Sequence, residues 1–200
     1  ANVGNFSVAF GKDTRAAGKS AFAIGRNAFA DGDFSFAAGD DVTASGNFSL
    51  AIGDKATSTN FASLAVGYQV NSTGLGATAL GWEADAPSAF ELVFGLFPEE
   101  YRPNDVYNFH PDDRLCTIGN GMGSSQRSNA LTIFKSGEMD FNGTLFLKND
   151  TIPVGDGTLQ LLNIEGGTFV GSNTAVVYSN VIDKTFNTTS LPTTVDYRVD

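Results

Sequence analysis

The chain has 200 residues and a net charge of −10, and only 17% of its residues are charged. This acidic balance, without a basic patch, argues against nucleic acid and against an anionic membrane surface as partners. No apolar run is long enough to span a bilayer, so no membrane contact is expected within this segment. Glycine and phenylalanine are abundant, and little in the composition indicates helix.

Glycine recurs every seventh residue from Gly4 to Gly95, with Asn60 and Ser88 in its place at two positions, and a fuller pattern recurs every fourteenth. A coiled coil also has a seven-residue period, but its buried seam needs large apolar residues among good helix formers. Glycine at every seventh position excludes that arrangement. The pattern instead predicts a solenoid in which each coil takes fourteen residues and packs on its neighbours.

One half of each repeat alternates small and large residues, which is typical of a strand whose successive side chains point to opposite faces. A closed coil of this length leaves little room inside, so the small side chains are predicted to form the core of the roll. They are Ser7, Ala9, Gly11, Ala23, Gly25, Ser35, Ala37, Gly39, Ser49, Ala51, Gly53, Ser63, Ala65 and Gly67.

The large side chains of the same half-repeats face outward in one contiguous stripe. They are Val8, Phe10, Phe22, Ile24, Phe36, Leu50, Ile52, Leu64, Val66 and Leu80. Such a stripe exceeds the few hundred Å² of apolar patch that a soluble monomer usually exposes, so something must cover it. The simplest way to bury the stripe is to pack copies of the same chain around a symmetry axis. The stripe is therefore the predicted subunit interface.

The other half of each repeat carries mostly polar outward residues and is predicted to lie in water. Thr43 and Thr57 on this face invite an ice-binding interpretation, which requires a flat and regular threonine array. Arg15, Phe29 and Asp31 interrupt that array, so ice binding is not favoured.

The repeated Ser-x-Ala-x-Gly motif, alternating with Ala-x-Gly at a fourteen-residue period, resembles the head repeat of YadA-like trimeric autotransporter adhesins. The resemblance covers about the first 95 residues. It implies a left-handed parallel β-roll, three copies of which associate along their apolar faces. It also implies an outer-membrane-anchored adhesin that binds host matrix or cell-surface components. No binding residue is carried over by the motif.

The repeat decays after Gly81, and Glu91 takes a place that Ser or Ala holds in earlier coils. A roll must end with a cover over its last open edge. We therefore predict a β-roll head over residues 1–97, a cap or linker over 98–111, and a small all-β fibre or tip region over 112–200.

Residues 113–121 and 127–137 resemble a segment of fibre-like bacterial surface proteins and phage tail fibres, while the neck that leads into a coiled-coil stalk in the adhesins is missing. This departure makes a phage or secreted tail fibre that binds a receptor the alternative to a membrane-anchored adhesin. Asn142-Gly143 then indicates a β-hairpin, because both residues tolerate positive φ. No fold is predicted for residues 151–200.

The sequence offers little chemistry. His110 has Asp112 and Asp113 beside it, but this spacing is not that of a metal site, and the group is interpreted as a solvated turn. No nucleophile motif accompanies the histidine. Cys116 is the single cysteine and is predicted to be a buried thiol in an apolar strand. No catalytic residue, metal or cofactor is predicted, and an enzyme is not expected.

Together these features predict an extracellular, homotrimeric fibre or adhesin, at the cell surface or free of it, that attaches to host, prey or matrix components. Its expected partners are further copies of itself and a surface glycan or protein receptor whose identity the sequence does not reveal. Repeated weak contacts of a trimer would gain from multivalency.

Overall fold

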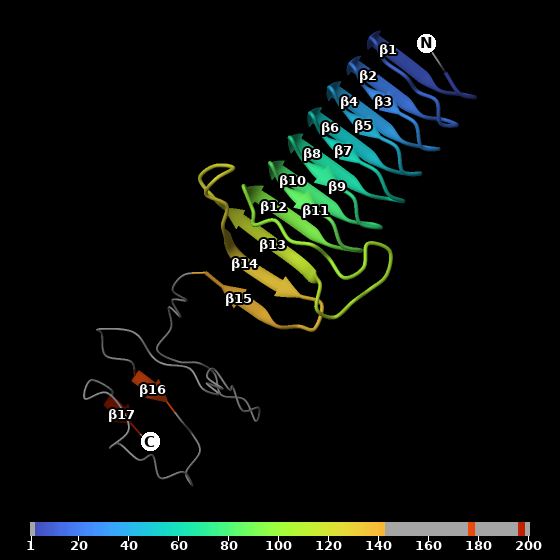
Figure 1. Ribbon diagram of the computed structural model, residues 1–200. Coiled ribbons are helices and arrows are strands. Elements are labelled where there is room, and N and C mark those ends of the chain that lie inside the picture. The colour runs from blue at the N-terminus through green and yellow to red at the C-terminus, as the bar shows by residue number, and fades with distance from the viewer. Residues whose placement is uncertain (1–2, 143–175, 179–195, 199–200) are drawn as a thin grey trace. The chain divides into compact units, whose positions relative to one another are not determined.

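The computed structural model describes residues 3–142, 176–178 and 196–198 (Figure 1). The chain divides into two compact units, Ala1–Leu147 and Lys148–Asp200. The first unit contains strands β1 to β15.

In the second unit, strand β16 (Val176–Tyr178) pairs in parallel with β17 (Asp196–Arg198). The predicted hairpin at Asn142-Gly143 needs a second strand beyond position 143, which lies outside the described residues.

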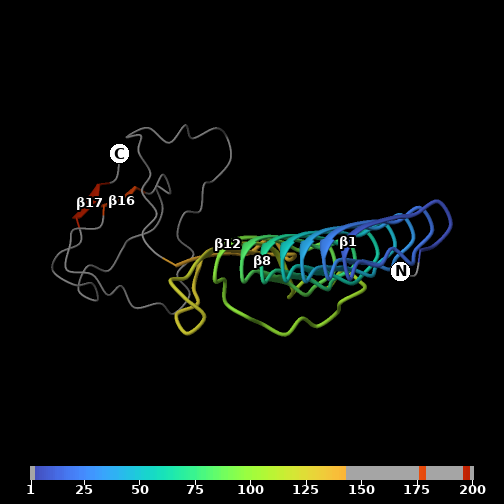
Figure 2. The same cartoon turned by 90° about the horizontal axis from the view of Figure 1, so that it is seen from above.

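Two parallel ladders of strands form the coils of the first unit, which follow one another along the roll in Figure 2. The long strands are β1 (Val8–Lys12), β2 (Phe22–Arg26), β4 (Phe36–Asp40), β6 (Leu50–Asp54), β8 (Leu64–Tyr68), β10 (Thr78–Trp82) and β12 (Leu92–Leu96). The short strands are β3 (Phe29–Ala30), β5 (Thr43–Ala44), β7 (Thr57–Ser58), β9 (Asn71–Ser72) and β11 (Asp85–Ala86). Each strand pairs with the one a single repeat later, as Phe22 with Phe36 and Leu50 with Leu64. This confirms the predicted all-β solenoid of fourteen-residue coils.

The core of the roll consists of small side chains. Ala23, Ala37, Ala51 and Ala65 are completely buried, and the serines at the start of the long strands are nearly so: Ser35, Ser49 and Ser63. The first coil is more open, because Ser7 and Ala9 are only half-buried and Gly11 is exposed. The later glycines Gly25, Gly39, Gly53 and Gly67 are half-buried. Because so little side-chain volume lies inside, backbone hydrogen bonds between coils carry much of the cohesion.

Glycine recurs in the long strands because the backbones of neighbouring coils meet there. At Gly39 φ is 138°, a conformation that L side chains rarely adopt. A methyl group added to Gly39 would lie 1.9 Å from the carbonyl oxygen of Gly53, which is backbone and has nowhere to move. The recurring glycines therefore set the spacing of the stack.

A cap of three further strands ends the stack: β13 (Arg114–Asn120), β14 (Asn129–Phe134) and β15 (Met139–Phe141). Strand β13 adds in parallel to β12, with Gly119 opposite Gly95, so it extends the sheet of the roll. Strands β14 and β15 then pair antiparallel. One ten-stranded sheet thus crosses the boundary expected between 111 and 112. The segment 97–113, drawn in lime green in Figure 1, is a long loop that connects the adjacent strands β12 and β13.

Candidate functional site

The outward side of the long-strand sheet is an apolar face with two columns of side chains. The first column begins at Val8 and runs through Phe22, Phe36, Leu50 and Leu64. The second column begins at Phe10 and runs through Ile24, Ala38, Ile52, Val66 and Leu80. Val8 is 47% and Phe10 69% exposed, and the others are half-buried in the single chain. The structure therefore gathers the residues predicted for the subunit interface on one continuous surface.

This apolar face extends beyond Leu80, where the sequence interpretation ended it. Phe94 is opposite Ile118, which is opposite Leu131, which in turn is opposite Phe141. Paired residues of adjacent strands project to the same side of a sheet. The cap therefore continues the same apolar face as far as β15.

Cys116 belongs to this extension. It lies opposite Leu92 in β12 and opposite Ile133 in β14, and it is half-buried. The thiol is therefore half-buried and not buried as predicted, because β13 stacks on the roll and places this residue on the outward face. Burial, and secondly the charge of Glu91, raise the pKa of the thiol, which keeps it protonated.

A second apolar feature lies at the corner of the coil that precedes five of the seven long strands, and the sequence interpretation missed it. We call it the aromatic corner, and it consists of Phe6, Phe34, Phe48, Phe61 and Phe90. These side chains are between 50% and 88% exposed. The Phe34 and Phe48 rings stack with centroids 5.0 Å apart and planes 6° from parallel, and Phe61 meets Phe48 edge-on at 5.4 Å.

The backbone at this corner is left-handed for a structural reason. Phe34 and Phe48 have φ values of 59° and 60°, and their N–H groups donate to the carbonyls of Lys19 and Asp33 in the preceding coil. Stacking thus imposes the conformation, whatever residue occupies the position. A left-handed conformation costs a residue with a Cβ atom about 1–2 kcal/mol, and glycine or asparagine would fit better. Phenylalanine is therefore retained at a cost to the single chain.

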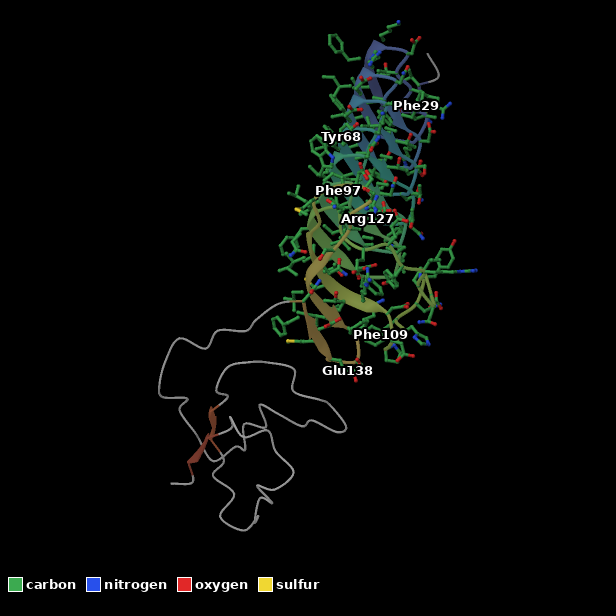
Figure 3. The ribbon with its side chains drawn as sticks, turned by 60° about the vertical axis from the view of Figure 1, so that its left-hand side comes forward. Phe29, Tyr68, Phe97, Phe109, Arg127 and Glu138 are labelled. Carbon is green, nitrogen blue, oxygen red and sulfur yellow. The ribbon has the colours of Figure 1, made fainter. Side chains whose placement is uncertain are left out.

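The opposite face, over the short strands, is polar as predicted. Arg15 forms an ion pair with Asp31, and its guanidinium lies 4.8 Å from the centre of the Phe29 ring. Figure 3 shows Phe29 and Tyr68 on different sides of the roll. Further along, Asn71 donates to Asp85 at 2.7 Å, and burial raises the pKa of the Asp85 carboxyl.

A shallow hollow of about 350 Å³ lies on this polar side, near the cap. It is lined by Lys55, Gln69, Asn71, Glu83, Asp85, Glu100 and Arg127. Arg127 is already bound to Glu83 at 2.9 Å and to Glu100 at 3.1 Å. The charge of Arg127 is therefore balanced within the chain, and its contact with Glu83 links the cap to the roll.

Glu91 occupies an inward position where earlier coils have Ser or Ala, and it is 1% exposed. Its Oε2 accepts hydrogen bonds from the Ser88 N–H at 3.0 Å and from the Tyr101 hydroxyl at 3.1 Å. Its Oε1 has no partner among the described residues. Burial raises the pKa of Glu91 to about 7, against the opposing effect of these hydrogen bonds. This carboxyl joins the last coil of the roll to the long loop.

Asp113 is a second buried carboxyl group at the same end. Its carboxylate accepts hydrogen bonds from the Asn104 N–H at 2.7 Å, the Asn104 amide at 2.9 Å and the Asp105 N–H at 3.1 Å. Burial opposes its ionisation, but these bonds prevail and lower the pKa of Asp113. Lys135 is also buried and donates to the Ser88 hydroxyl at 3.0 Å, and burial lowers its pKa. These groups organise the cap.

His110 lies in the long loop, with its Nδ1 atom 3.9 Å from the Asp112 carboxylate, and both side chains are substantially exposed. Among residues 3–142 and the two short strands of the second unit, no group of three or more His, Cys, Asp or Glu side chains is placed to hold a metal ion. In the same part of the chain, no helix is long and apolar enough to cross a membrane.

The described fold defines the class: a β-solenoid that presents extended surfaces, one apolar and one polar. Comparison with known families then shows that residues 16–41 and 58–84 match the YadA head domain repeat, in two copies. The roll therefore carries repeats of the YadA head type, a type found in trimeric autotransporter adhesin-type surface proteins. A search of curated proteins found no match to the chain.

Proposed function

We propose that the protein is a homotrimeric surface adhesin whose roll projects as a rigid rod and attaches to host, prey or matrix components. The observation that carries this proposal is the apolar face. It follows the long strands from Val8 to Phe141, and it leaves large side chains such as Phe10 mostly in water in the single chain. Three copies around an axis parallel to the rod would bury this face on one another.

The polar face then points outward three times in each particle. Its ion pair Arg15–Asp31 and its Asn71–Asp85 contact are available to a polar ligand. A surface glycan or a protein receptor fits this chemistry, and three copies would raise the apparent affinity of a weak contact. The protein would act at the cell surface or in the extracellular space.

The first test is the solution mass of the full chain, measured by light scattering coupled to gel filtration. Three chains of 21.0 kDa per particle are expected. The trimer would then be screened against glycans and matrix proteins. A stable monomer would mean that the apolar face has another cover and would overturn the homotrimer. A trimer that binds nothing on these screens or on intact cells would overturn attachment.

The alternative is a phage or secreted tail fibre that uses the same trimer to bind a receptor. The match to the YadA head domain repeat favours the adhesin. The neighbouring genes separate the two: an outer-membrane anchor in the parent gene supports the adhesin, and adjacent tail genes support the phage fibre.

A further inference from the structure

We propose that the aromatic corner is a second contact strip of the trimer, inserted into the apolar face of the neighbouring copy. This inference rests on the proposed homotrimer and adds to it residues that the stripe does not contain. Its occupant is a second copy of this chain.

The first reason is that the aromatic corner continues the apolar face. Phe34 and Phe48 are each separated by one inward serine from Phe36 and Leu50, which belong to the first column of that face. Phe36 itself stacks on Phe22 with centroids 5.2 Å apart. The corner and the stripe therefore form one surface that extends across several coils.

The second reason is the asymmetry of the two borders of the stripe. Beyond the second column, the border carries Lys12, Arg26, Asp40 and Asp54 in the first four coils, where Arg26 is paired with Asp40. In the later coils the same position is taken by Tyr68, Trp82 and Leu96. The border on the other side is the aromatic corner. A three-fold ring needs two different edges on each copy, because its contacts are heterologous. In the coils of Phe34 and Phe48, the aromatic corner faces a charged border that ends in Asp40 and Asp54. There the corner is the edge suited to enter a neighbour's apolar face, and the charged border is suited to face water.

The third reason concerns the geometry of the rings. Phe34 and Phe48 stack face to face, so each covers one face of the other, and Phe61 makes an edge-on contact with Phe48, which leaves fewer ring faces open. A sugar that packs on an aromatic ring needs a free face, whereas apolar side chains of a protein pack well against ring edges. The stacking therefore favours a protein surface over a glycan.

The fourth reason is the backbone. The left-handed corner positions are also occupied by Ser20, Ala62 and Gly76, so the fold does not require phenylalanine there. A Phe residue in that conformation destabilises the isolated chain, and exposing its apolar ring to water adds no stabilisation. Burial against a neighbour supplies the compensating stabilisation.

The test is a double variant of the full chain, Phe34→Asn with Phe48→Asn. Asparagine tolerates the left-handed conformation, so the variant should fold at least as well as the wild type, which circular dichroism and a melting curve would establish. The matched control is Ala62→Asn, which makes the same backbone change at φ 54° without removing a ring. If the double variant does not fold, the single Phe48→Asn variant takes its place.

Subunit association is then measured by light scattering over a dilution series. We expect the double variant to dissociate at concentrations at least about tenfold higher than the wild type, with the control unchanged. An unchanged trimer in the double variant would overturn the inference while leaving the proposed homotrimer intact. A wild type that is monomeric at every concentration would overturn both. An unchanged trimer that loses binding to cells or glycans would assign the corner to an external ligand and overturn the inference equally.

Discussion

The roll and its cap obtain stability in different ways. The roll buries almost only alanine, serine and glycine, and each coil repeats the register of the previous one, as Ala37 opposite Ala51 shows. The junction of roll and cap buries Glu91, Asp113 and Lys135, which are held by specific polar contacts, such as that of Glu91 with Tyr101. The repeated coils tolerate little added side-chain volume at their inward positions. The capped end depends instead on a few polar contacts that are not repeated. The predictions below test this difference.

The largest effect is expected inside the roll, for Gly39→Ala. The added methyl group would meet the Gly53 carbonyl, and φ at this site is already strained for any L side chain. We expect the free energy of unfolding to fall by about 5 kcal/mol or more, measured by urea unfolding. Gly123→Ala is the control, since nothing lies within 4 Å of its added methyl group, and it should change stability by less than about 0.5 kcal/mol. Equal effects at the two glycines would contradict the role given to close stacking.

Next in size is Asp113→Ala, which removes the acceptor of three hydrogen bonds in the cap. The Asn104 and Asp105 donors would lose their buried partner, and we expect a loss of about 3–4 kcal/mol on thermal unfolding. The neighbouring Asp112→Ala should be nearly neutral, because that side chain is 78% exposed. A neutral Asp113→Ala would show that the long loop contributes nothing to the cap.

The pH dependence of the cap follows from Glu91. Its pKa rises from 4.5 to about 7 on folding, so the folded state binds the proton more tightly and stability falls as the pH rises from about 4.5 to 7. The shift corresponds to about 3 kcal/mol at most. Glu91→Gln cannot ionise and should remove this part of the decline, seen as the difference between the two proteins in melts from pH 4 to 8. Parallel profiles would mean that Glu91 does not titrate in this window.

The smallest effect is expected on the polar face of the roll, for Arg15→Gln. The guanidinium is 43% exposed and its partner Asp31 is 26% exposed, so water screens the ion pair. Loss of this pair and of the contact with Phe29 should lower the free energy of unfolding by about 0.5–1 kcal/mol. This destabilisation should be smaller in high salt, which screens the ion pair. A loss above about 2 kcal/mol would place this pair among the structural determinants of the roll.

The sequence was sufficient to predict the roll because one rule, repeated every fourteen residues, sets both the core and the register. The cap breaks that rule. Cys116 lies opposite Leu92, 24 residues earlier, because the long loop intervenes, so the period could not place β13 on the sheet. The recurrence of glycine at Gly95 and Gly119 was the available signal. The aromatic corner escaped detection for another reason: a phenylalanine such as Phe34 gives no sequence indication of a left-handed backbone, which glycine or asparagine would have given.

The reversal of strand direction in the cap has a consequence for how these molecules can grow. A bare solenoid end is a template of parallel strands, on which the first coil of another roll could add in register and begin a filament. In the cap β14 runs opposite to the roll's strands, and among the described residues only the long-strand ladder continues, because the ladder of short strands ends at β11. The cap thus offers an incoming coil only one of the two ladders that it would have to pair with. The cap therefore acts as a terminator against lengthwise polymerisation from its end of the sheet, while the long apolar side stays available for a closed assembly of defined size.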